Sequence, residues 1–233
     1  MKHLLLLASL LFSSLLHAGD DWELVDRPEA RDAVTVWTKP VPGQSLKAFK
    51  GEIEVPHSLL TVLAVLGDIP RFPDWVFQCN DAYPLPTFGY DINYVHIAGI
   101  WPVSPRDVVT RTTLEQDPDT LAITAHTVAA QGLYPEKKGT VRLPSLDNLF
   151  VMTPLADGWT RITFETFVDP GGLIPGWLAN LVAVSAPRDS LEGMYSLMDE
   201  KKYQVDVAQD LPMDFPALAT MIFPPGPAQN SIQ

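Results

Sequence analysis

The chain has 233 residues, with 16 Lys and Arg against 28 Asp and Glu, and a formal net charge of −12. This charge argues against nucleic acid as a partner, because phosphate backbones repel a negative protein. No cluster of basic residues in the sequence predicts a locally positive surface that would overcome this repulsion. The single cysteine, Cys79, excludes an intramolecular disulfide and a thiolate metal cluster.

The N-terminus predicts a secretory signal peptide over residues 1–18. Lys2 is followed by an apolar run over residues 4–16, and Ala18 ends the segment at the expected cleavage point. The alternative is a membrane anchor, but the run is shorter than the roughly 20 residues that span a bilayer. We therefore expect an exported protein, periplasmic or extracellular, whose mature chain carries a charge of about −13.

The first part of the mature chain predicts short helices around one hairpin. In order, we expect one or two helical turns near 20–25, strands at 33–38 and 46–55, a helix at 59–66 and a second, proline-broken helical connection at 69–76. The helix at 59–66 is apolar nearly all round, which indicates burial.

The middle of the chain predicts strand after strand. We place strands near 80–87, 90–98, 106–115, 120–129, 139–143, 149–155 and 159–168, with Gly, Asp, Asn and Pro at the turns between them. The last strand alternates cleanly, with Phe164 and Thr166 on one face and Arg161 and Glu165 on the other.

A rigid turn, DPGG at 169–172, joins this strand to a long helix that begins near Pro175. Trp177, Leu178 and Leu181 follow at helical spacing and form its apolar face. Pro187 is expected to kink this helix or split it. We assign residues 19–210 to one domain and residues 211–233 to a Pro-rich C-terminal tail, whose apolar middle either packs across the domain or stays free.

Four local motifs in this order resemble the START domain family, named after the steroidogenic acute regulatory protein. They are LKAFKG at 46–51, DWV at 74–76, WPVSPRDVV at 101–109, and DPGG at 169–172 leading into IPGWL at 174–178. The resemblance covers about 22–203 and implies an α+β helix-grip fold. In that fold, a curved antiparallel β-sheet wraps around a long C-terminal α-helix and encloses an internal cavity.

The resemblance implies binding of one hydrophobic ligand, such as a lipid, a fatty acid or a sterol-like molecule, without catalysis, and transfer of that ligand as a further expectation. It implies no cofactor and no metal, and we expect a monomer with transient membrane contact. Two alternatives stay open. One is a helix-grip hydrolase or cyclase that uses His96, Tyr94 and Arg106. The other is an interaction protein whose pocket has collapsed.

Tyr94 and His96 share the even positions of their strand with Ile92, so we expect this face to point into the cavity. There the two side chains either contact the polar end of a ligand or are satisfied core residues.

Arg106 is the candidate we single out for the ligand headgroup. By strand parity it shares a face with Val108 and Thr110, and its planar fork suits a carboxylate, phosphate or carbonyl. The alternative is an arginine at a strand start with its head in solvent. Family members in animals pair an interior arginine with an acid from the preceding strand, but that strand offers Tyr94 and His96 here.

The aromatic candidates are Trp75, Trp101 and Trp177, which either line the cavity mouth or close the core. Together with Phe164, Thr166, Leu178 and Leu181 on the predicted inner faces, they complete the set of candidate ligand-binding residues.

Overall fold

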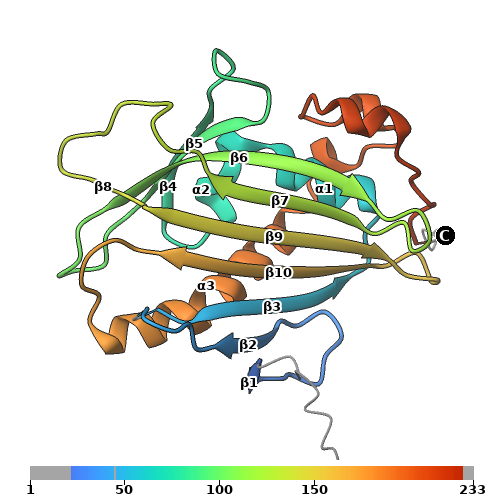
Figure 1. The fold of residues 1–233 in the computed structure, drawn as a ribbon. Coiled ribbons are helices and arrows are strands. Elements are labelled where there is room, and N and C mark those ends of the chain that lie inside the picture. Colours follow the sequence, from blue (N-terminus) through green and yellow to red (C-terminus); the bar gives the residue numbers. More distant parts are fainter. Residues whose placement is uncertain (1–21, 45, 228–233) are drawn as a thin grey trace, which may run out of the picture.

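The computed structural model describes residues 22–44 and 46–227, and the predicted signal peptide lies outside them. One curved sheet wraps around a long C-terminal helix, α3 (Gly176–Leu197) (Figure 1). Its strands are β1 (Glu23–Asp26), β2 (Thr35–Lys39), β3 (Ala48–Val55), β4 (Cys79–Pro84), β5 (Ile92–Ile97), β6 (Arg106–Gln116), β7 (Ile123–Ala129), β8 (Val141–Arg142), β9 (Ser145–Pro154) and β10 (Thr160–Asp169). They lie in the order β1-β2-β3-β10-β9-β7-β6-β5-β4, all antiparallel, while the short β8 pairs with β6 in parallel. This is the expected α+β helix-grip fold.

Two short helices connect β3 to β4, as the sequence predicts. Ser58 caps α1 (Leu59–Gly67) by accepting a hydrogen bond from the Thr61 amide at 3.2 Å. The first seven residues of α1 are buried, which agrees with its apolar composition. A 3₁₀ turn (Ile69–Arg71) and α2 (Phe72–Trp75) follow directly. Further 3₁₀ turns lie at Lys201–Tyr203, Ala208–Asp210 and Pro216–Thr220.

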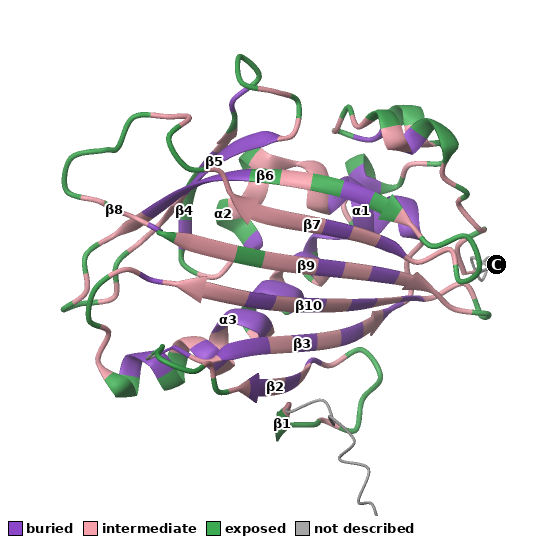
Figure 2. Cartoon of the chain, in the orientation of Figure 1, coloured by how far each residue is buried: buried purple, intermediate pink, exposed green. Residues whose placement is uncertain are grey.

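The central strands β3 and β10 alternate between a buried inner face and a more exposed outer face (Figure 2). Phe49 and Phe164 point inward and meet edge to face, with ring centroids 5.9 Å apart. Outward, Arg161 donates to Glu54 from the neighbouring strand at 2.6 Å. The period of two thus places the core on the concave side, under α3.

Helix α3 runs without a break through Pro187, so the expected split does not occur. A Cβ added to Gly51 of β3 would lie 2.9 Å from the Pro187 Cβ and 2.8 Å from Leu191 Cδ1. The glycine therefore lets the proline turn of α3 rest directly on the sheet. These contacts with the sheet offset the loss of the backbone hydrogen bond that Pro187 cannot donate within the helix.

The helical turns expected near 20–25 are wrong, because the described part of this segment forms β1. All four β1 residues are exposed, and the strand pairs with the edge of β2. A helix this short has few internal hydrogen bonds, whereas the open edge of β2 satisfies its backbone groups.

The middle of the C-terminal tail packs across the domain, which settles the alternative left open by the sequence. Leu211 and Leu218 are buried in the main core. The side-chain amide of Gln116 bonds both the backbone nitrogen and the carbonyl of Ile222, each at 2.8 Å. Within the described residues, no helix has the length and apolar character needed to cross a bilayer.

Candidate functional site

A cavity of about 660 Å³ lies between the concave face of the sheet and the helices. Strands β5, β6, β7, β9 and β10 form its floor, and α2 and α3 contribute Trp75 and Ser190. The volume falls within the range of about 300–1,000 Å³ that is usual for sites that enclose one small molecule. The cavity therefore has room for a ligand between sheet and helix.

Apolar side chains form most of the cavity wall. At one end Phe150 and Phe164 stack with centroids 4.3 Å apart, and Trp75 meets Phe150 edge to face at 6.2 Å. At the other end the wall is formed by Val95, Ile97, Val108, Leu143 and Leu146. These walls suit a hydrocarbon skeleton.

A band of uncharged polar side chains crosses the floor between the two apolar ends. We call it the polar belt; it consists of Thr166, Asn148, Thr127, Thr112, Thr110 and Asn93. Thr166, Asn148, Thr127 and Thr112 are in register across β10, β9, β7 and β6, while Thr110 and Asn93 form the next pair toward β5. All but Thr166 line the cavity.

Hydrogen bonds inside the belt leave several polar groups available. Thr166 donates to Asn148 Oδ1, and the hydroxyls of Thr112 and Thr127 share one bond of 2.9 Å. Asn93 is 7% exposed, and its side-chain amide forms no hydrogen bond with another described residue. The Thr110 hydroxyl donates to the backbone carbonyl oxygen of Asn93, not to its side chain. The indole N–H of Trp75 is also buried without a partner in the described part of the chain. Unpaired buried donors are rare in proteins, so these groups are free for a ligand.

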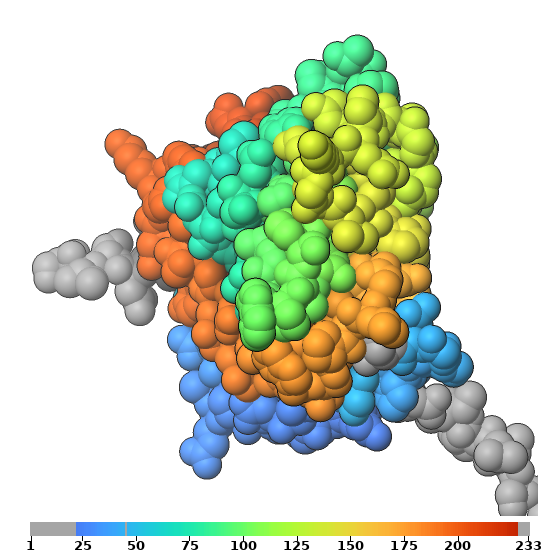
Figure 3. Space-filling view, turned by 90° about the vertical axis from the view of Figure 1, so that its left-hand side faces the viewer, coloured from blue at the N-terminus to red at the C-terminus, as the bar shows by residue number. Residues whose placement is uncertain are grey.

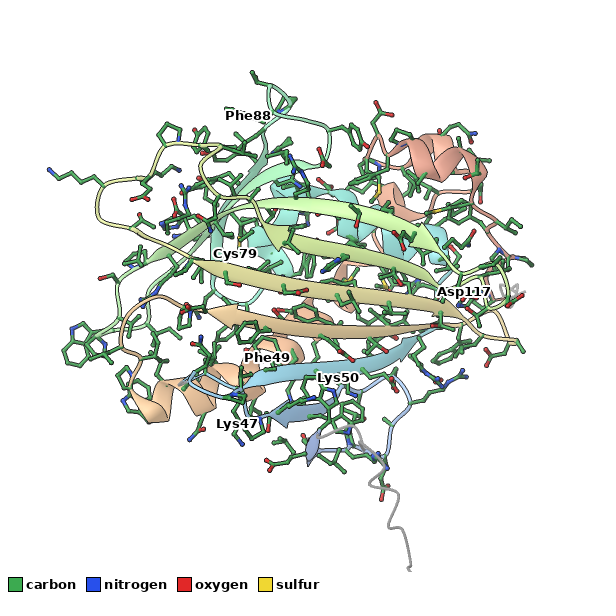
Figure 4. All side chains as sticks on the ribbon, in the orientation of Figure 1. Lys47, Phe49, Lys50, Cys79, Phe88 and Asp117 are labelled. Atoms are coloured by element: carbon green, nitrogen blue, oxygen red, sulfur yellow. The ribbon has the colours of Figure 1, made fainter. Side chains whose placement is uncertain are left out.

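The cavity opens between the β4–β5 connection and the C-terminal tail. Tyr90, 57% exposed, meets Phe215 of the tail edge to face at 5.3 Å, and Met213 also lines the opening. Phe88 lies farther out, at the tip of the β4–β5 connection (Figure 4). The mouth therefore joins parts of the chain that are far apart in sequence.

The two acids of the lining, Asp68 and Asp214, lie at this mouth. Asp68 accepts from Lys202 at 2.8 Å and from the Tyr203 hydroxyl at 3.1 Å, while Asp214 is exposed. No Lys, Arg or His belongs to the lining formed by the described residues.

Arg106 lies outside the cavity, although Val108 and Thr110 of the same face do line it. Its guanidinium donates to the carbonyl oxygens of Ser104 at 2.5 Å, Pro170 at 3.2 Å and Gly171 at 3.2 Å. Burial lowers the pKa of Arg106, and no carboxylate of a described residue forms an ion pair with it. In the structure it ties the β5–β6 loop to the turn after β10.

The expected inward direction of Tyr94 and His96 is wrong. The neighbouring residues Asn93, Val95 and Ile97 face the cavity, and Ile92 packs with Tyr94 on the opposite side of β5. The polarity pattern fails here because residues 130–134 cover the outer face too, so both sides of the strand are buried.

On that outer face, Tyr94 joins a buried ionic network. Its hydroxyl donates to Asp107 at 3.1 Å, and Arg142 donates to the same carboxylate at 2.8 and 3.1 Å. Burial tends to raise the pKa of Asp107, but the hydrogen bonds from Arg142 and Tyr94 outweigh it and hold that pKa below its usual value. Burial, reinforced by Asp107, raises the pKa of Tyr94 to about 12. His96 bonds to Asn80 beside this network.

The remaining candidates divide between cavity, core and surface. Trp75 and Phe164 line the cavity, and Thr166 holds Asn148 at its edge. Leu178 is buried but outside the lining, whereas Trp101, Trp177 and Leu181 are exposed at 87%, 57% and 42%. Sequence reasoning missed Asn93, Asn148, Met213 and Phe215. Asn148 pairs with Thr166 across β9 and β10 and so shares the inward face predicted for Thr166. No local sequence pattern indicates that Met213 and Phe215 of the tail line the cavity.

A sheet that grips a C-terminal helix around an apolar cavity defines a helix-grip protein able to enclose a small hydrophobic molecule. The START domain family model matches residues 6–193. An uncharacterised protein of Pseudomonas aeruginosa is 33% identical over 184 residues, which cover 78% of this chain and 89% of that protein. The mouse phosphatidylcholine transfer protein is 26% identical over 182 residues, 76% of this chain and 83% of its own.

Among solved structures, a STAR-related lipid transfer protein from Xanthomonas axonopodis superposes with a TM-score of 0.69 at 30% identity. The match covers 78% of this chain and all of that one. Human STARD10, with a TM-score of 0.62 and 22% identity, shares the fold over 78% of this chain and 74% of its own. The chain belongs to the START domain family.

Proposed function

We propose that the protein binds one hydrophobic lipid molecule in its cavity and carries it without chemical change. The observation that carries this proposal is the cavity of about 660 Å³ with apolar ends and a polar belt between them. The START match and the lipid transfer proteins among its relatives support the same conclusion.

The side chains that the enzyme alternative needs as general acid and base lie outside the cavity. Tyr94 lies on the opposite face of β5 from the cavity, and His96 shares that parity. The guanidinium N–H groups of Arg106 donate hydrogen bonds to backbone carbonyl oxygens. A general acid or base must reach the reacting group within hydrogen-bond distance, and none of these three side chains belongs to the cavity lining formed by the described residues.

Purification from the native host, followed by native mass spectrometry and extraction, tests the proposal. We expect one hydrophobic molecule per chain, released on unfolding. Ala125, buried on the cavity floor, provides the variant: Ala125→Trp fills space that a ligand needs and should lower occupancy while the circular dichroism stays that of a folded protein. Exposed Ala219→Trp is the matched control. A wild-type protein that arrives empty and takes up no hydrophobic probe would exclude lipid carriage.

We also propose that one end of the molecule touches membranes while ligand is exchanged. Two loops meet there, residues 98–105 and 170–175, as Figure 3 shows in green and orange. They present Trp101 and Leu173, the latter 97% exposed, and α3 adds Trp177. Neither residues 98–105 nor 170–187 contain an ionisable side chain, in a chain of net charge −12. Uncharged surface rich in tryptophan suits the membrane interface.

Vesicle cosedimentation tests this contact. Trp101→Ser with Leu173→Ser should abolish binding to uncharged phosphatidylcholine vesicles, while Val207→Ser with Ile222→Ser, which removes two exposed apolar side chains elsewhere, should not. Binding to anionic vesicles should be weaker at low salt, because the protein is acidic. Binding that follows anionic lipid instead would contradict the proposal.

Export and a monomeric state complete the proposed function. The predicted signal peptide supports export, and the single buried Cys79 is compatible with an oxidising compartment. Cell fractionation and the mass of the mature chain, expected to begin at Gly19, test the first; light scattering of the purified protein tests the second.

A further inference from the structure

Among the described residues, no positively charged side chain lines the cavity to receive an anionic headgroup. The charged lining residues among those described are the two acids at the mouth, Asp68 and Asp214. A phosphate or carboxylate that is buried without a counter-charge loses its hydration, and hydrogen bonds from uncharged donors offset only part of that loss. Arg106, which the sequence singled out for the headgroup, donates to three backbone carbonyl oxygens outside the lining.

The belt offers uncharged hydrogen-bonding groups instead. Asn93 presents a whole unpaired amide, and the Asn148 amide nitrogen donates to no other described residue. Because Thr112 and Thr127 share a single bond, one of their two hydroxyl hydrogens remains free to donate. These groups match a hydroxyl, an ester or an amide, each of which both accepts hydrogen bonds and carries no charge.

The position of the belt limits where the ligand carries its polar group. Apolar side chains flank the belt on both sides, with Phe150 and Phe164 toward one end and Val95 and Val108 toward the other. A polar group at the belt therefore has apolar skeleton on either side of it.

We infer that this protein selects uncharged lipids whose hydroxyl, ester or amide group lies part way along an apolar skeleton, with the polar belt as the selecting element. This inference rests on the proposed function and names its ligand class. Lipids with a buried phosphate or carboxylate are excluded by the missing cation, whatever the length of their chains.

A matched series of probes tests the selection in the full mature chain after delipidation. Palmitamide, hexadecanol and hexadecyl phosphate carry their polar group at the end of a chain of equal length, and N-octyloctanamide carries its uncharged amide in the middle of such a chain. In equimolar competition by native mass spectrometry at pH 8, we expect the uncharged probes to occupy the protein at least tenfold more than the phosphate, and N-octyloctanamide to occupy it more than palmitamide. Occupancy by N-octyloctanamide at or below that of palmitamide would contradict a polar group part way along the skeleton. Equal or greater occupancy by hexadecyl phosphate would overturn the inference while leaving lipid binding intact. If no probe binds at all, the proposed function itself fails.

Two variants locate the selection in the belt. Asn93→Leu and Asn148→Leu keep a similar side-chain size and remove the amides, so each should lower the affinity for palmitamide about two- to tenfold. Thr113→Val, on the exposed outer face of β6 directly beside Thr112, is the control and should bind as wild type does. If both asparagine variants fold and bind palmitamide with unchanged affinity, the belt does not select the ligand. If one variant fails to fold, the other decides the role of the belt.

Discussion

Replacing Arg106 with methionine separates a structural role for this guanidinium from a role in ligand binding. It donates to carbonyl oxygens in two different loops, at Ser104 on one side and at Pro170 and Gly171 on the other. Hydrogen bonds from charged groups contribute about 1.5–3 kcal/mol each. Burial lowers the pKa of Arg106, so the charged form carries a desolvation cost that offsets part of this gain. Counting one bond for each loop, we expect Arg106→Met to lower the free energy of unfolding by about 2–3 kcal/mol.

Urea unfolding of delipidated protein, followed by circular dichroism, measures this change. Arg111→Met is the matched control: it lies on the same strand, its side chain is 51% exposed, and its ion pair with Asp91 contributes less than about 1 kcal/mol. Affinity for hexadecanol should be unchanged in both variants. If Arg106→Met has unaltered stability and loses affinity for hexadecyl phosphate tenfold, this reasoning is refuted and Arg106 binds the ligand.

Three further predictions concern packing and ionisation away from the belt. Asp107→Asn leaves the buried Arg142 guanidinium without its counter-charge and should cost about 3–5 kcal/mol in urea unfolding at pH 7; a loss below about 1 kcal/mol would show that water reaches the pair. Gly51→Ala places a Cβ 2.9 Å from Pro187 and should destabilise the fold by about 1–3 kcal/mol, and an unchanged melting temperature would mean that α3 shifts freely on the sheet. Burial lowers the pKa of His57, so the unfolded chain binds more protons below about pH 6.5 and stability should fall as pH drops through that value. His57→Gln should remove this part of the pH dependence, and a variant that keeps the full wild-type slope would assign it to other groups.

The sequence predicts the fold well because most strands have only one covered face. On β10 the alternation of Phe164 with charged outer neighbours matches a sheet that is buried on its concave side. Four short motifs then fix the order of elements within the START domain family. Errors arise where local pattern and tertiary context diverge, as in the exposed edge strand β1, which pairs with β2 instead of forming a helix.

The cavity is harder to predict, for physical reasons that particular residues illustrate. Strand β5 is covered on both faces, so its apolar Ile92 and Tyr94 indicate burial without telling which side is inside. Asn93 faces the cavity because register with Thr110 places it there, although a polar residue beside apolar ones suggests the opposite. Met213 reaches the mouth through tail packing that no local periodicity encodes.

The tail has a consequence for how such proteins diversify. The family match ends at residue 193, yet the wall of the cavity continues to Phe215. Residues 212–215 contact the cavity without belonging to any strand, so mutations there can reshape the opening and leave strand register untouched. The residues that form the sheet and α3 and some of the residues that line the cavity opening therefore lie in separate parts of the sequence. Substitutions at Met213 or Phe215 therefore change the shape of the opening while the sheet and α3 that form the rest of the cavity stay as they are.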